Sequence, residues 1–277
     1  MLPKYGRVFG VLATWSERIF HAFDARRLRT FGRARLIPPL TGRAGGHSAY
    51  TDWVFQSGVY AGLVGALNPS PRRVLDVGCG AGSIVAGLLQ TLAPTATYLG
   101  VDIDPDMIVR CQRTFGDPRA TFAVLEGHSP VYQAVAGVPR LYLADLCATR
   151  QWDLIILKAV LDHLTPTAIR TTLHTCSEGL APGGRLIATA FVLDAEAQAS
   201  ARAPRFAFAD AYLGEPGFRY TAAFSPVPEA QLALEAEHLM GLLIIANLRL
   251  VAVLPGTWRD AEGGRGVDMP DTLILGA

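Results

Sequence analysis

The sequence predicts an α/β domain with a doubly wound, mostly parallel sheet and helices on both faces. From Arg73 onward, short apolar runs of strand length alternate with segments of helical length, a pattern typical of such a sheet. Residues 153–157 (DLIIL) are apolar after the first position, as expected of a strand buried on both faces.

Each expected element has a local reason. The run 74–77 is apolar and closed by glycines, and Pro105 and Pro166 each stand in a first helical turn, where a missing N–H costs little. Strands are expected at 74–77, 97–101, 120–125, 153–157, 185–191, 250–254 and 272–275. Helices are expected at 50–67, 83–92, 105–115 and from 165 onward, and residues 227–246 are expected to be mostly helical. A loop rather than a helix joins the last two strands, which predicts a seven-stranded sheet with an antiparallel edge strand.

Two segments fall outside the alternation. Residues 1–69 are expected to form an N-terminal helical cover or lid on the main domain of residues 70–277, because apolar positions between Val8 and Phe23 recur at helical spacing. Residues 192–226 are rich in aromatic side chains and are interpreted as an insertion that forms a wall or lid of a substrate pocket.

The composition limits the classes of function. Of the 277 residues 50% are hydrophobic, and mean hydropathy is +0.27, so the chain can bury a large core. Lys and Arg (25) balance Asp and Glu (24), which gives no overall attraction to nucleic acid. Residues 1–43, however, hold nine basic and two acidic side chains.

The compartment and the metal content are further expectations. The four cysteines are widely spaced and form no CxxC pair, so we expect no metal site, no disulfide framework and a reducing, cytoplasmic location. No apolar run reaches the length of a membrane span. The Arg-rich start lacks the apolar core of a secretion signal; a transit peptide is the alternative.

The strongest motif is the run 74–82, VLDVGCGAG, in which a strand enters a loop with Gly78, Gly80 and Gly82. A dinucleotide-binding loop would need GxGxxG, and Ser83 stands where its third glycine should be. Asp76, two residues upstream of the first glycine, would repel a pyrophosphate. It suits a ligand that carries an ammonium group.

Residues 74–107 resemble the class I S-adenosylmethionine-dependent methyltransferase family, and the weaker likeness extends over about 70–277. The resemblance implies that Asp76, Gly78, Cys79, Gly80 and Gly82 hold the amino-acid end of S-adenosylmethionine. Asp102 closes the second strand, where a carboxylate can accept hydrogen bonds from ribose hydroxyls. Ile103 would pack on the adenine by the same resemblance. The alternative for Asp102 is a cap of the Pro105 helix.

Two further positions match the family less closely. Gly127-His128 stands where the family usually has Gly-Asp, so His128, its backbone or Glu126 would meet the adenine, or His128 is an ordinary loop residue. After the fourth strand, Lys158 is expected to line the pocket or to pair with Asp162. His163 is a candidate general base, because its ordinary pKa lies near neutrality; the alternative is a structural histidine.

The expected function is methyl transfer to a small, largely apolar acceptor by O- or N-methylation, as the aromatic segment 192–226 suggests. The alternatives are an RNA-modifying methyltransferase, a nicotinamide-dependent oxidoreductase and a non-catalytic domain that keeps the cofactor site. A nucleic-acid partner is not expected. Residues 8–35 combine an apolar stripe with arginines, which leaves membrane-surface contact as another alternative.

Overall fold

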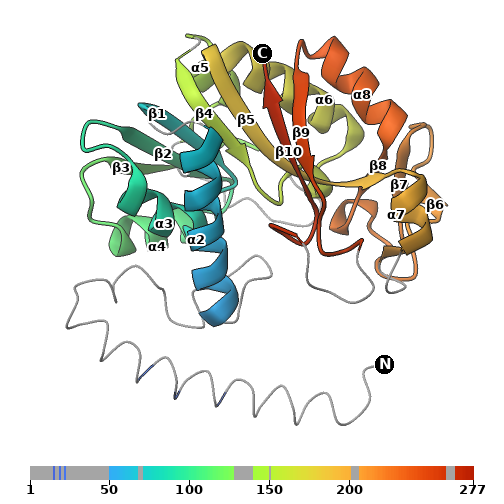
Figure 1. Cartoon of the computed structure of the whole chain (residues 1–277), viewed down its shortest axis with the longest axis horizontal. Coiled ribbons are helices and arrows are strands. Elements are labelled where there is room, and N and C mark those ends of the chain that lie inside the picture. Colours follow the sequence, from blue (N-terminus) through green and yellow to red (C-terminus); the bar gives the residue numbers. More distant parts are fainter. Residues whose placement is uncertain are drawn as a thin grey trace.

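A computed structural model describes residues 15, 19, 22, 50–67, 71–127, 140–149, 151–200, 206–259 and 266–277. Its sheet joins ten strands (Figure 1), which are β1 (Arg73–Val77), β2 (Thr97–Asp102), β3 (Ala120–Val124), β4 (Trp152–Leu157), β5 (Leu180–Leu193), β6 (Asp210–Ala211), β7 (Phe218–Tyr220), β8 (Ala233–Glu235), β9 (Arg249–Leu254) and β10 (Asp271–Gly276). The seven that the sequence predicts form one continuous order, β3-β2-β1-β4-β5-β10-β9.

The direction of the strands confirms the predicted architecture. Strands β1 to β5 are mutually parallel, with Leu75 of β1 between Leu99 of β2 and Ile155 of β4. Strand β10 is antiparallel to both β5 and β9. The antiparallel strand therefore lies one place inside the edge, and β9 forms the edge itself.

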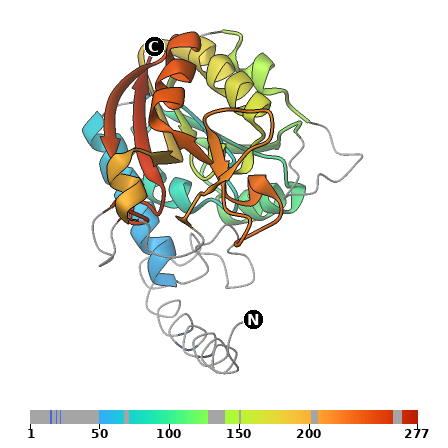
Figure 2. The same ribbon diagram turned by 90° about the vertical axis from the view of Figure 1, so that its right-hand side faces the viewer.

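Helices cover both faces of the sheet (Figures 1 and 2). They are α2 (Tyr50–Leu67), α3 (Ser83–Thr91), α4 (Pro105–Thr114), α5 (Leu143–Cys147), α6 (Pro166–Gly179), α7 (Ala195–Ser200) and α8 (Ala236–Ile245), with short 3-10 turns η3 (Leu161–His163) and η5 (Pro228–Ala230). Helices α2, α3 and α4 share one buried apolar cluster with the sheet, and α5, α6 and α8 share another. No described helix is both long and apolar enough to span a bilayer.

Two expectations about the second half of the chain hold only in part. Residues 227–246 are mostly helical, over η5 and α8, but β8 between them pairs with the end of β5 and with β7. Within the expected wall segment 192–226, Phe224 lines the cavity described below, whereas Phe206 and Phe208 do not. They are buried with Phe191 and Trp258 in a separate aromatic cluster, with ring centroids 5.1–6.5 Å apart.

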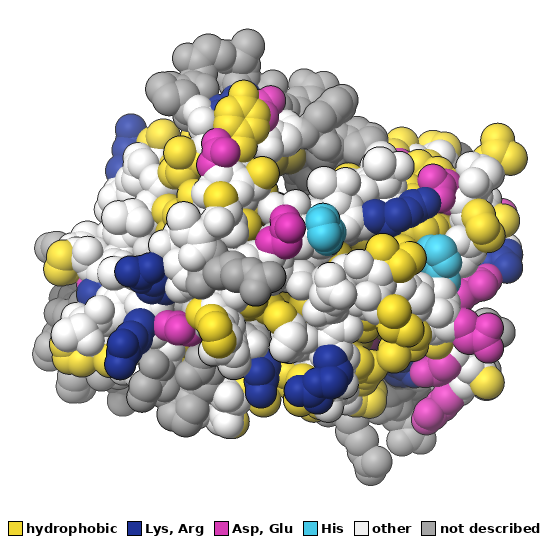
Figure 3. Space-filling view, turned by 90° about the horizontal axis from the view of Figure 1, so that it is seen from above, with side chains coloured by type: hydrophobic (Ala, Val, Ile, Leu, Met, Phe, Trp, Pro, Cys, Tyr) yellow, Lys and Arg dark blue, Asp and Glu magenta, His cyan; other side chains and the backbone are white. Residues whose placement is uncertain are grey.

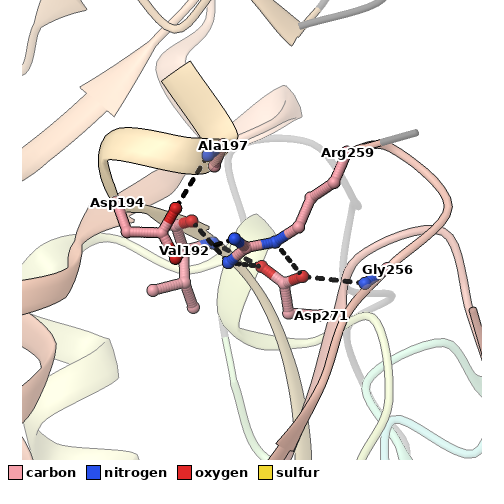
Figure 4. Close-up of polar contacts among 6 residues, drawn as sticks. All are labelled: Val192, Asp194, Ala197, Gly256, Arg259 and Asp271. Atoms are coloured by element: carbon pink, nitrogen blue, oxygen red, sulfur yellow. Dashed lines mark hydrogen bonds and ion pairs between the residues drawn. The ribbon is translucent and has the colours of Figure 1, made fainter. Parts of the chain in front are cut away.

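A buried ion pair ties this aromatic cluster to the sheet (Figure 4). The guanidinium of Arg259 donates to both carboxylate oxygens of Asp271, at 2.6 and 2.9 Å, and to Asp194 at 2.7 Å. Asp271 is fully buried and also accepts from the backbone N–H groups of Val192 and Gly256. The end of β5, the loop after β9 and the start of β10 are thereby held together.

The predicted N-terminal cover lies mostly outside the described residues. Helix α2 is formed as expected and packs along α3. Trp15 and Ile19, two described residues of the apolar stripe, are 64% and 40% exposed, so these two do not pack on the domain.

The order of the strands locates the ligand site. Chain order runs outward in opposite directions from β1 and β4, which are neighbours in the sheet. In open α/β sheets such a switch point leaves a crevice at the carboxyl ends of the strands. These ends lie on the lower side of the molecule in Figure 1.

Candidate active site

The glycine loop after β1 is shaped by left-handed backbone. Gly78, Gly80 and Gly82 have φ of +76°, +52° and +86°, a region that L side chains rarely adopt. The N–H of Gly78 donates to Val101 at 2.7 Å, which holds the loop against β2. A Cβ on Gly80 would meet no atom within 4 Å, so this part of the loop is open to a ligand.

Gly82 has a different role from the one that the resemblance implies. A Cβ at this position would lie 2.3 Å from Phe115, and Gly82 does not line the cavity described below. A residue without a side chain is required at position 82 so that α3 can begin beside α4. Gly82 therefore supports the loop by packing.

Asp76 is buried beneath the glycine loop and has an unused acceptor atom. Tyr98 Oη donates to its Oδ2 at 2.5 Å, whereas its Oδ1 has no hydrogen-bond partner among the described residues. Burial, reinforced by the nearby Asp102, raises the pKa of Asp76 to about 7, although Tyr98 and Lys158 act in the opposite direction. A buried carboxylate oxygen that lacks a hydrogen-bond partner is costly, and an ammonium group beside Oδ1 would remove that cost.

Asp102, at the end of β2, organises the loop as well as facing the cavity. Its two oxygens accept from the backbone N–H groups of Gly80, at 2.8 Å, and Asp104, at 2.9 Å. The cap of α4 is Asp104, which accepts from Asp106, so the capping alternative for Asp102 is wrong. Each carboxylate oxygen has further lone-pair capacity for a ribose hydroxyl.

One cavity of about 990 Å³ collects most of the predicted site residues. Its lining includes Asp76, Gly78, Cys79, Gly80, Asp102, Ile103, Gly127, Lys158 and His163. The space is large enough for a nucleoside cofactor together with a second small molecule. His128 lies outside the described residues.

Lys158, at the tip of β4, pairs with an acid that the sequence does not single out. Its Nζ lies 3.3 Å from Oδ2 of Asp268, and Tyr60 Oη of α2 donates to the same oxygen at 3.0 Å. All three side chains are buried. Helix α2, β4 and the loop before β10 therefore meet in one polar network at the cavity wall.

Asp162 and His163 form the second polar group of the cavity. His163 Nδ1 lies 3.1 Å from the backbone oxygen of Glu229, and its Nε2 lies 3.5 Å from Oδ2 of Asp162. A carbonyl oxygen can only accept, so Nδ1 bears a proton and Nε2 is the atom that can take one up. Burial raises the pKa of Asp162, because it disfavours the charged carboxylate. A proton on Nε2 of His163 would stabilise that carboxylate.

Several lining residues were missed by sequence reasoning. Asp268 and Gln231 lie in irregular segments without periodicity, and only the fold brings them to the cavity. Trp53 and Gln56 of α2 do line it, as a helix closing over the site would. Within the described ranges no group of three or more His, Cys, Asp or Glu side chains could hold a metal ion, and the four cysteines are free and buried.

Comparison with known proteins agrees with this geometry. Residues 75–186 match the family model of a methyltransferase domain. The tRNA N(3)-methylcytidine methyltransferase Mettl2 of Drosophila melanogaster is 28% identical over 120 residues, which is 42% of this chain and 34% of that protein. The chain thus spans about a third of the length of this relative.

Solved structures share the fold at low identity. A putative O-methyltransferase from Nostoc punctiforme superposes with a TM-score of 0.51, 15% identity, and coverage of 83% of this chain and 58% of that one. An S-adenosylmethionine-dependent methyltransferase from Mesorhizobium loti gives a TM-score of 0.50 at 15% identity, over 80% of this chain and 99% of that one.

Proposed function

We propose that the chain is a class I S-adenosylmethionine-dependent methyltransferase and that it methylates a hydroxyl or amine on a small, largely apolar molecule. One observation carries the proposal: the cavity that holds the glycine loop continues without a break to Asp162 and His163. A donor site and an acceptor site would thus share one cavity.

The donor half fits the cofactor. The unpartnered Oδ1 of Asp76 is available to an ammonium group, the open side of Gly80 leaves room for the amino-acid portion, and Asp102 and Ile103 suit the ribose and the adenine. S-adenosylmethionine supplies an electrophilic methyl group when it is bound there. The chain itself has to align the acceptor with that methyl group and exclude water.

In the acceptor half, His163 is the proposed general base. Its Nε2 would take the proton of an acceptor hydroxyl, and the adjacent Asp162 would stabilise the imidazolium that results. The backbone oxygen of Glu229 fixes the ring orientation through Nδ1. Helix α2 would close the chamber through Trp53 and Gln56. It would thus act as one part of the N-terminal cover expected for residues 1–69.

Methylation of an RNA base is the second candidate, and the relative from Drosophila melanogaster favours it. Against it, lining acids outnumber lining bases in the cavity, which is unfavourable for phosphates. Figure 3 shows the face at the amino ends of the parallel strands, away from the cavity, where Lys and Arg side chains lie among acidic and apolar ones. A phosphate backbone calls for clustered basic side chains.

The test is to supply methyl-labelled S-adenosylmethionine and a cell extract separated into small molecules and RNA. Label in the small-molecule fraction supports the proposal, and label in RNA alone contradicts it. His163→Gln should lower the rate with a hydroxyl acceptor by about 10²–10⁴-fold without changing the affinity for S-adenosylhomocysteine. Glu237→Gln, an exposed change on α8, is the matched control.

A further inference from the structure

The acceptor half of the cavity contains buried oxygens without hydrogen-bond partners. Within the described part of the chain, Oδ1 of Asp162, Oε1 of Gln56 and Oε1 of Gln231 accept no hydrogen bond. The three residues are 4%, 5% and 4% exposed, and all line the cavity. Leaving such an atom unsatisfied in the folded protein is unfavourable. A bound molecule that donates hydrogen bonds there removes this cost.

These oxygens come from two separate segments of the lining. Gln56 Nε2 donates to the backbone oxygen of Val267 at 3.4 Å, which fixes the amide so that its oxygen is the unused atom. In the second segment, the N–H of Leu232 donates to the backbone oxygen of Asp162 at 3.0 Å, which places Gln231 beside Asp162. A ligand that reaches both segments would meet these three acceptors and one donor, the Nε1–H of Trp53, which also has no partner among the described residues.

The charged side chains of the lining are mostly acidic. Its acidic members are Asp76, Asp102, Asp104, Glu126, Asp162 and Asp268, and among the described lining residues Lys158 is the only Lys or Arg. Lys158 is already paired with Asp268. The methyl donor would compensate Asp76, so Asp162 is the carboxylate that remains for the acceptor. An anionic acceptor would be repelled in this low-dielectric space.

We propose that the chamber selects an acceptor with a flat apolar body and at least two N–H or O–H donors, neutral or cationic, and rejects carboxylates and phosphates. Trp53 and Phe224 supply apolar faces, and Asp162, Gln56 and Gln231 accept the donated hydrogen bonds. This substrate class rests on the proposed function. It also places RNA phosphates outside the chamber.

The test compares three probes of one ring system: tryptamine, indole and indole-3-acetate. Each is titrated into the full chain by calorimetry, with and without saturating S-adenosylhomocysteine. Tryptamine should bind at least about tenfold more tightly than indole-3-acetate, a difference of about 1.4 kcal/mol, with indole between them. Asp162→Asn should reduce that ratio to less than about threefold, close to 0.6 kcal/mol, and Glu237→Gln should leave it unchanged.

Gln231→Leu serves as a second variant if Asp162→Asn does not fold, and it should weaken tryptamine binding by removing one acceptor. Equal or tighter binding of indole-3-acetate, no binding of any probe, or an unchanged ratio in the folded variant would overturn the proposal. Because the titrations without S-adenosylhomocysteine test the chamber alone, failure of donor binding is read separately, as failure of the proposed function.

Discussion

Replacing Asp76 by Asn should make the ligand-free protein more stable while it weakens binding of the methyl donor. The carboxylate is 1% exposed, and one of its oxygens has no partner among the described residues. Tyr98 can still donate to the amide oxygen of Asn. The substitution therefore removes a buried charge and keeps one hydrogen bond.

The magnitude follows from the pKa. Burial raises the pKa of Asp76 from 3.8 to about 7, and one pKa unit corresponds to about 1.4 kcal/mol. Ionising this group in the folded, ligand-free protein thus costs up to about 4 kcal/mol at pH 8 relative to an unperturbed carboxyl group.

The sign of the pH dependence follows from the same shift. The folded pKa is the higher one, so the folded state binds more protons between pH 3.8 and about 7. Stability contributed by the protonated form is present at low pH and is lost as the pH rises toward 7. Bound S-adenosylhomocysteine brings an ammonium group, which should lower the pKa of Asp76. The buried charge of Asp76 should then no longer destabilise the folded protein.

The assay is urea unfolding of wild type and Asp76→Asn at pH 6, 7 and 8, with and without S-adenosylhomocysteine. Without ligand the variant should gain stability, and the gain should be larger at pH 8 than at pH 6. With S-adenosylhomocysteine present, the variant should no longer be more stable than wild type, because it binds that ligand more weakly. A ligand-free variant that is less stable than wild type at pH 8 would refute this reasoning, and Glu237→Gln should show no pH-dependent difference.

Three further substitutions separate ligand contacts from scaffold. Asp102→Ala should weaken S-adenosylhomocysteine binding by about 1–3 kcal/mol and also lower the ligand-free melting temperature, because Gly80 loses its acceptor; unchanged affinity in calorimetry would contradict the first part. Gly82→Ala should unfold far more readily than Gly80→Ala in thermal melts, because only the former meets Phe115 at 2.3 Å; equal melting temperatures would contradict this. Arg259→Met should lower the free energy of unfolding by about 3–5 kcal/mol, because it leaves a buried carboxylate unpaired. The control, Arg219→Met, removes a half-exposed ion pair and should cost less than about 1 kcal/mol. A similar loss of stability in both variants would contradict this prediction.

The sheet was predictable from the sequence because its strands are short apolar runs and its first loop needs glycine. Gly78 and Gly80 adopt positive φ, and their spacing after an apolar strand already separates this loop from a dinucleotide-binding one. Asp76 and Asp102 were predictable for the same reason, since they stand at fixed distances from that loop.

The remaining features depend on contacts between distant segments. Residues 227–246 have the composition of a helix, but β5 extends to Leu193 and recruits β8 as a partner. Phe206 and Phe208 look like pocket residues in sequence, yet Trp258 and Phe191 bury them elsewhere. Asp268 has no periodic context, and its ion pair with Lys158 exists only because the loop before β10 folds back over β4.

The most direct test of the account is the binding of the methyl donor's product. Calorimetry on the full chain should show S-adenosylhomocysteine bound at one site per chain, with affinity reduced in Asp76→Asn and Asp102→Ala, and no measurable binding of NAD. Tight binding of NAD without any response to S-adenosylhomocysteine would contradict the assignment of the glycine loop and, with it, the proposed methyl transfer.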